Sequence, residues 1–187
     1  DHGYAFPLPA MTAQVAAQDP DLLYFAGDQI YEVYGGFGLV RSPPETAMLD
    51  YLRKYYQFGW TWRNLLKDRP AVIIPDDHDV FQGNLWGAGG RPLPVPLRFS
   101  SGGYAMPPSW IKAVERTQTG HLPDPANSEP IAQGLTTYYT AFEIGGIPVA
   151  VLEDRKFKSG PDQYRATGKK GRDAVARDAA DAQLLGA

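Results

Sequence analysis

Cysteine is absent from the 187-residue sequence, and this absence excludes disulfides and thiolate metal sites. Any metal ion must therefore use nitrogen and oxygen ligands, and only three residues are histidines. Long hydrophobic runs are absent too: none approaches the roughly 20 residues of a membrane-spanning helix, so we expect no membrane span. Basic stretches are few, and a net charge of -3 gives no electrostatic reason to expect a nucleic-acid-binding patch.

The residues that are present are typical of a globular domain. Hydrophobic residues make up 43% and charged residues 21%, and this length fits one domain over residues 1–187 better than two. The 17 prolines and 20 glycines predict long ordered loops. The first residue is Asp1 rather than Met, which suggests processing or excision from a longer chain.

Helix-like and strand-like patterns alternate in the first half of the sequence. An alanine-rich helix is expected over residues 10–21, and a short buried strand over residues 22–28. Residues 43–70 predict one long or broken helix, and the β-branched run at 71–74 predicts a second buried strand. The alternation of helix and strand predicts an α/β fold.

The helix expected over residues 43–70 is recognised by its apolar periodicity. Its apolar residues, at steps of three and four, are Leu49, Leu52, Tyr56 and Trp60. Aromatic side chains at helical spacing belong to a core more often than to a substrate cleft, so Trp60, Trp62 and Trp110 are expected in the core, and Trp86, next to the Gly-rich loop, is the candidate for a cleft.

The second half of the sequence is less regular. Residues 81–133 are rich in Gly and Pro with little periodicity, which predicts an elaborated surface insertion. Two strands are expected around Gly145 and Gly146, the best hairpin signal in the sequence. Residues 162–187 are charged and alanine-rich, and they predict a helix at least from about Arg172.

Acidic residues follow both of the strands predicted in the first half. Asp28 ends the first strand, and the second strand runs into the turn Asp76, Asp77, His78 and Asp79. Ligands of open α/β sheets bind at the carboxyl ends of strands, so these two clusters are expected to meet. Their mutual repulsion is costly unless they are solvated, hydrogen-bonded or bound to a hard cation. A solvated turn and helix N-cap is the alternative reading.

The sequence resembles the alkaline phosphatase D (PhoD-like) family of the calcineurin-like phosphoesterase superfamily. The resemblance is carried by GDQIYE at 27–32, YLRKYYQFGWTWRNLL at 51–66, DDHD at 76–79 and VAVLEDRK at 149–156. It covers most of the sequence and is weakest in the Gly/Pro-rich insertion. It implies part of a metallophosphatase α/β sandwich, with a mixed sheet and covering helices.

The resemblance also implies a role for each matched residue. Asp28 would bridge two metals, Tyr31 would ligate the more highly charged ion, and Asp77 stands where the superfamily usually has an asparagine ligand. His78 would stabilise or protonate the leaving group, and Asp79 would orient His78. The implied cofactor is a dinuclear centre of Fe(III) with Ca, Zn or Mn.

The activity implied by this resemblance is hydrolysis of phosphate esters by a metal-bound hydroxide, as in alkaline phosphatases and phosphodiesterases. Asn84 and Arg155 are expected to bind the substrate, Arg155 through a bidentate phosphate contact; a salt bridge at the sheet end is the alternative for Arg155. Because members of the family are commonly exported, an extracellular or periplasmic location is expected.

The sequence also departs from the pattern of the superfamily. The first metal motif and the two later histidine motifs are not visible, so we expect the middle of a phosphatase domain, with too few ligands for two ions. Two other functions are therefore kept open. One is a truncated, non-catalytic domain that acts as a binding or structural module, and the other is an unrelated metal-dependent carboxylate hydrolase.

Overall fold

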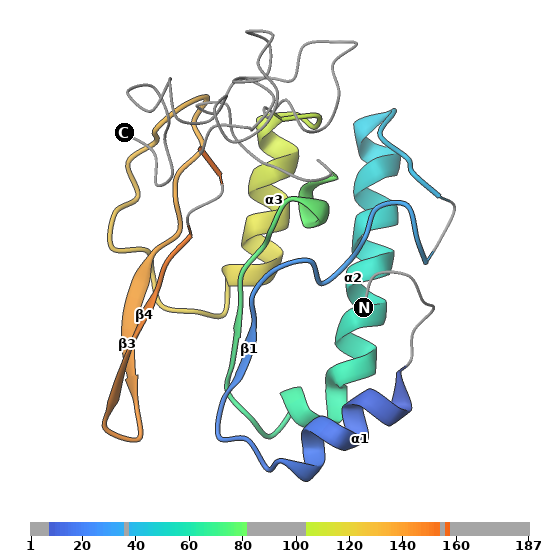
Figure 1. Cartoon of the computed structure of the whole chain (residues 1–187). Coiled ribbons are helices and arrows are strands. Elements are labelled where there is room, and N and C mark those ends of the chain that lie inside the picture. Colours follow the sequence, from blue (N-terminus) through green and yellow to red (C-terminus); the bar gives the residue numbers. More distant parts are fainter. Residues whose placement is uncertain (1–7, 36–37, 82–103, 154–155, 158–187) are drawn as a thin grey trace, which may run out of the picture.

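The computed structural model describes residues 8–35, 38–81, 104–153 and 156–157, and these form a mixed α/β structure (Figure 1). The elements, in chain order, are α1 (Pro9–Ala17), β1 (Leu23–Phe25), α2 (Pro44–Leu66), β2 (Ala71–Ile73), the short 3-10 helix η1 (His78–Val80), α3 (Pro108–Thr119), β3 (Thr140–Ile144) and β4 (Ile147–Val151). The α/β class, the two helices expected before residue 70 and both strands of the first half are thereby confirmed. None of the helices in the described ranges is long and apolar enough to cross a membrane.

Strands β1 and β2 form a parallel pair, joined by α2. Leu23 pairs with Ala71 and Phe25 with Ile73, and the backbone N–H of Ile74 extends the ladder to the carbonyl of Phe25 at 3.1 Å. Because the strands are parallel and in register, their carboxyl ends lie side by side. The pairing of β1 with β2 therefore brings the two acidic turns together, as expected.

Successive residues of β2 face opposite layers of the structure. Val72 packs with Tyr138 and Val151 of the hairpin side, whereas Ile73 packs with Phe58 and Trp62 of α2. This alternation is the normal two-residue period of a strand. It places the β1–β2 pair between the β3–β4 hairpin and α2, the arrangement seen in Figure 1.

Strands β3 and β4 form the antiparallel hairpin expected from the sequence. Thr140 pairs with Val151, and Ile144 with Ile147, across the turn at Gly145 and Gly146. The two glycines have φ of 58° and 78°, and two-residue hairpin turns that need positive φ at both positions favour glycine. Within the described residues the two strand pairs are separate sheets, so the larger mixed sheet of a sandwich stays a prediction.

Helix α2 exists as expected, and Trp62 and Trp110 are buried as expected, but the apolar periodicity that identifies α2 does not mark its buried face. Leu49, Leu52, Tyr56 and Trp60 are 69%, 41%, 66% and 52% exposed. The buried face instead carries Ala47, Asp50, Tyr51, Lys54, Phe58, Thr61 and Trp62. Polar residues in this stripe hide its periodicity: the ammonium group of Lys54 donates to Asp50 at 2.7 Å and to the carbonyl of Glu32 at 2.6 Å.

Helix α3 contradicts the expectation that residues 81–133 have little regular structure and lie at the surface. It begins at Pro108, a favoured first-turn residue, and ends before Gly120. Trp110, Ile111 and Val114 pack in the main core with Tyr51 of α2. The Gly and Pro content of the flanking sequence concealed a core helix. Residues 82–103 of this segment lie outside the described ranges.

A buried ion cluster attaches α3 to the chain beyond β4. Lys156 is 0% exposed, and its ammonium group contacts Glu115 of α3, Glu153 at 3.0 Å and the carbonyl of Thr136 at 2.8 Å. A buried ammonium group is tolerated when several oxygens surround it in this way. The helix expected over residues 162–187 lies outside the described residues.

The two faces of α2 predict different costs for the same substitution. Tyr51 is 0% exposed and Tyr56 is 66% exposed, so they form a matched pair. Tyr51→Ala is expected to lower the free energy of unfolding by about 3–5 kcal/mol, and Tyr56→Ala by about 0.5 kcal/mol or less. Urea denaturation of both variants measures this difference. Equal losses would contradict the buried face described above.

Candidate metal centre

The loop after β1 approaches the loop after β2 at Gly27. This glycine has φ of 100°, and a Cβ added to it would lie 2.3 Å from the Cβ of Asp76. Glycine is therefore required both by the backbone conformation and by the close approach of the two loops. Asp28 follows with φ of 56°, a left-handed conformation that Asp tolerates better than most residues.

Asp79 holds the two loops together. Its carboxylate is fully buried and accepts hydrogen bonds from the backbone N–H groups of Asp28 at 2.7 Å, Asp76 at 2.9 Å and Ile30 at 3.3 Å. Burial raises the pKa of Asp79 to about 7, although the N–H groups of Asp76 and Asp28 lower it in part. Asp79 thus fixes the two loops relative to each other through hydrogen bonds to their backbones.

Three carboxylates meet at the ends of the two strands. One oxygen from each of Asp28, Asp76 and Asp77 lies within 4.8 Å of the others. Oδ1 of Asp28 is buried, and in the described part of the chain it has no hydrogen-bond partner. A buried carboxylate oxygen without a donor is costly, and a cation is the group that removes both this cost and the mutual repulsion.

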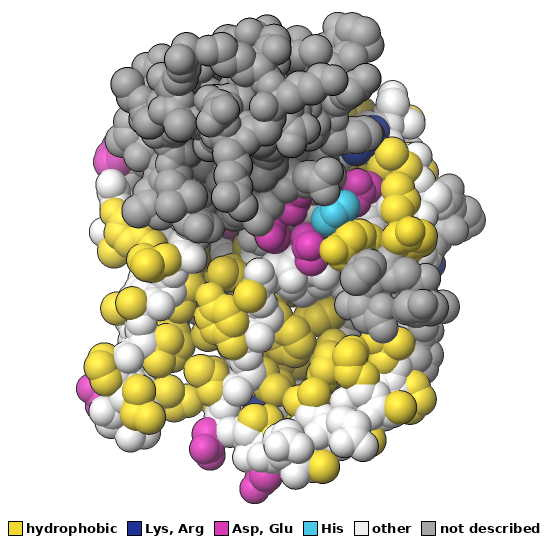
Figure 2. Space-filling view, viewed as in Figure 1, with side chains coloured by type: hydrophobic (Ala, Val, Ile, Leu, Met, Phe, Trp, Pro, Cys, Tyr) yellow, Lys and Arg dark blue, Asp and Glu magenta, His cyan; other side chains and the backbone are white. Residues whose placement is uncertain are grey.

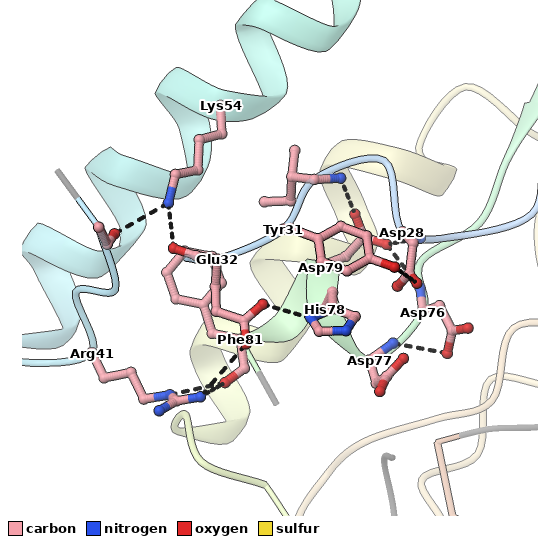
Figure 3. A network of polar contacts seen from close by, with 12 residues as sticks. Asp28, Tyr31, Glu32, Arg41, Lys54, Asp76, Asp77, His78, Asp79 and Phe81 are labelled. Carbon is pink, nitrogen blue, oxygen red and sulfur yellow. Dashed lines mark hydrogen bonds and ion pairs between the residues drawn. The ribbon is translucent and has the colours of Figure 1, made fainter. Parts of the chain in front are cut away.

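Tyr31 joins this cluster from the side of the β1 loop. Its hydroxyl donates to Oδ2 of Asp28 at 3.0 Å, and its ring stacks on His78 with 3.9 Å between ring centroids and 21° between planes (Figure 3). Burial and the negative charge of Asp28 raise the pKa of Tyr31 to about 12. In the absence of a cation the phenol therefore keeps its proton.

His78 lies between the acidic cluster and a second carboxylate, Glu32. Its Nδ1 is 2.6 Å from Oε2 of Glu32 (Figure 3). The guanidinium of Arg41 lies 3.8 Å from Oε1 of Glu32 and donates to the carbonyl of Phe81. Burial of His78 opposes its charged form, but the hydrogen bond and charge of Glu32 outweigh it and raise the pKa of His78.

The cluster borders a hollow in the molecular surface. Figure 2 shows acidic side chains and the histidine gathered at the upper edge of a face rich in apolar groups. A hollow of about 270 Å³ lies beside Asp28, and its wall includes Tyr24, Phe58 and Trp62. Among the three carboxylates of the cluster, Asp28 is the one that lines this hollow.

The structure brings together Asp28, Tyr31, Asp77 and His78, four of the residues that the sequence nominates. Asp79 was expected to orient His78, but Nδ1 of His78 is engaged by Glu32, and Asp79 instead accepts hydrogen bonds from backbone amides and from the side chain of Gln118. No role is expected for Glu32 from the sequence. Its one signal is its position directly after Tyr31.

Asn84 and Arg155 lie outside the described residues, so their substrate-binding roles stay predictions. Asp76 belongs to the cluster as one of its three carboxylates.

Comparison with protein-family models, curated proteins and solved structures gives no match for this chain. The resemblance to the PhoD-like family therefore depends on its motifs alone. Independently of this resemblance, a function can be inferred from the geometry of the two acidic loops.

The buried carboxylate of Asp79 predicts a pH dependence of stability. Because its pKa is raised from 3.8 to about 7 on folding, the folded chain retains a proton here that the unfolded chain loses. The stabilisation is fully present below about pH 4 and is lost as the pH rises through 7. Between about pH 5 and pH 8 the metal-free chain is expected to lose on the order of 1–3 kcal/mol through this group.

Urea denaturation at both pH values measures this loss, with Asp79→Asn as the test variant. The carboxamide still accepts hydrogen bonds but does not titrate, so the variant should show a smaller pH dependence than the parent chain. Asp21→Asn, at an exposed position, is the control and should behave like the parent. An unchanged pH dependence in Asp79→Asn would refute the assignment.

Proposed function

We propose that this chain is part of a metal-dependent phosphoesterase of the PhoD-like type, which hydrolyses phosphate mono- or diesters. The observation that carries the proposal is the convergence of Asp28, Asp76 and Asp77 from two strand ends, with oxygens within 4.8 Å of one another. These three side chains belong to the motifs GDQIYE and DDHD, in which the sequence resembles that family. The sandwich fold and an exported location are part of the same proposal.

The residues present fit a hard cation. Carboxylate oxygens are the ligands that Ca²⁺, Mn²⁺ and Fe³⁺ prefer, and the buried Oδ1 of Asp28 is a ligand atom still without a donor in the described part of the chain. The phenol oxygen of Tyr31, 3.0 Å from Oδ2 of Asp28, lies where it would serve the more highly charged ion. We propose Asp28, Asp77 and Tyr31 as ligands of a dinuclear centre of Fe(III) with Ca, Zn or Mn, and Asp76 beside them.

Such a centre would supply positive charge for the phosphate oxygens and would acidify water for attack on phosphorus. The chain itself contributes position and a proton donor. Asp79 and Gly27 hold the two acidic loops in contact, so the ligands are in place before substrate arrives. As the P–O bond to the leaving group breaks, the leaving oxygen takes the bonding electron pair and receives a proton from His78.

Cation binding is the first test of this proposal. Addition of Mn²⁺ to the metal-free chain is expected to raise the thermal midpoint by several degrees, because a ligand that binds only the folded chain stabilises it. Asp28→Asn and Asp77→Asn should lose most of this shift, and Asp21→Asn should keep it. No shift in the parent chain with Mn²⁺, Ca²⁺, Zn²⁺ or Fe³⁺ would remove the basis for a metal centre.

Hydrolysis is the second test, with the metal-loaded chain and alkyl and 4-nitrophenyl phosphates as substrates. His78→Ala is expected to lower kcat on the alkyl ester by about 10²–10⁴-fold, as loss of a general acid does. His121→Ala is the matched control, because His121 is exposed and its ring bonds only a backbone carbonyl among the contacts described. Cation binding without hydrolysis would favour the alternative of a non-catalytic binding module.

A further inference from the structure

Glu32 is a buried carboxylate that holds one side of the His78 ring. It is 4% exposed, and its Oε2 lies 2.6 Å from Nδ1 of His78. On an imidazole the two nitrogens point in different directions, so a partner at Nδ1 determines where Nε2 points. In Figure 3 the second ring nitrogen of His78 lies on the side away from Glu32, toward Asp76 and Asp77.

We infer that Glu32 is a positioning residue, which fixes His78 so that Nε2 faces the space beside the acidic cluster where a leaving group would lie. This inference rests on the proposed function and adds to it a role for Glu32, which lies in the GDQIYE motif but to which the resemblance assigns no role. Glu32 then has the orienting role that the resemblance implies for Asp79.

Two contacts together define the placement of the ring. The hydrogen bond from Nδ1 to Glu32 sets the rotation of the ring within its plane, and stacking on Tyr31, at 3.9 Å and 21°, sets the plane itself. Neither contact alone would do so, because a stacked ring can still turn within its plane. The accepting carboxylate also selects the ring form that carries hydrogen on Nδ1.

Glu32 can act in this way because it is itself held. Its backbone carbonyl accepts a hydrogen bond from Lys54 of α2 at 2.6 Å, and its second carboxylate oxygen lies 3.8 Å from Arg41. These contacts leave Oε2 directed at His78. A reactive group supported by a fixed neighbour keeps its productive geometry, which is the purpose of such support in active sites.

The contact itself is tested by NMR on the metal-free chain with ¹⁵N-labelled histidine. Only three histidines are present, so His78→Ala assigns the ring signals of His78. We expect a downfield Hδ1 signal, protected from exchange, that is lost in Glu32→Ala and retained in Glu32→Gln, whose carboxamide oxygen still accepts the hydrogen bond. Glu45→Ala, at an exposed position of α2, should leave the signal unchanged. Persistence of the signal in Glu32→Ala would overturn the inference.

The catalytic consequence is tested with esters of graded leaving groups on the metal-loaded chain. Poor leaving groups need a proton, whereas 4-nitrophenolate hardly does, so Glu32→Ala should lower kcat on the order of 10²-fold for an alkyl phosphate and much less for 4-nitrophenyl phosphate. Glu32→Gln should restore most of the alkyl rate. A merely structural role would lower both rates alike, and that result would overturn the inference.

Failure of the inference and failure of the proposed function give different results. If the parent chain hydrolyses both esters and Glu32→Ala does so with an unchanged ratio, the function stands and the role of Glu32 falls. If the parent chain binds cations but hydrolyses neither ester, the proposed function falls and the catalytic role of Glu32 falls with it. In the double variant His78→Ala/Glu32→Ala, a kcat equal to that of His78→Ala alone supports the inference, because Glu32 would then act only through His78.

Discussion

The rest of the site depends on the carboxylate of Asp79, which accepts hydrogen bonds from three backbone N–H groups. It joins the loop after β1 to the loop after β2, which are about fifty residues apart in sequence, at distances of 2.7 to 3.3 Å. These three backbone N–H groups lie beyond the ends of the short strands, where strand pairing no longer provides acceptors, so they need another hydrogen-bond acceptor. One buried side chain meets that need and at the same time brings Asp28 next to Asp76.

Polar contacts of Lys54, on the buried side of α2, and of Arg41, in the segment before α2, connect this loop contact to the core. Lys54 binds the carbonyl of Glu32 and the carboxylate of Asp50, and Arg41 binds the carbonyl of Phe81, which packs in the core against Trp110. Buried charges of this kind contribute little net stability, and the hydrogen bond from Lys54 to the carbonyl of Glu32 attaches the loop to α2. The long helix that joins the two strands thus also fixes the loop that carries Tyr31 and Glu32.

Local patterns predicted much of this structure, and long-range contacts account for what they missed. Strand β1, strand β2, the hairpin and the acidic loops follow from runs of two to five residues and their turn signals, so they were predicted correctly. The buried face of α2 was not, because Lys54 and Asp50 satisfy each other only once folded. Helix α3 was hidden by neighbouring Gly and Pro, and the partner of His78 lies 46 residues away. Contacts between distant side chains leave no periodic trace in a sequence.

The raised pKa values of Tyr31, Asp79 and His78 reflect an environment that would also act on a bound cation. Burial and the charge of Asp28 raise the pKa values of Tyr31 and Asp79, and Glu32, Asp28 and Asp77 raise that of His78 against the effect of its burial. Protons on these groups therefore offset part of the negative charge in the metal-free chain. A cation among the three carboxylates would oppose the same charge, so its binding and proton binding compete. Burial and the negative charge gathered at the ends of β1 and β2 together raise the pKa values of Tyr31 and Asp79, and the same negative charge favours a cation beside the unpartnered oxygen of Asp28.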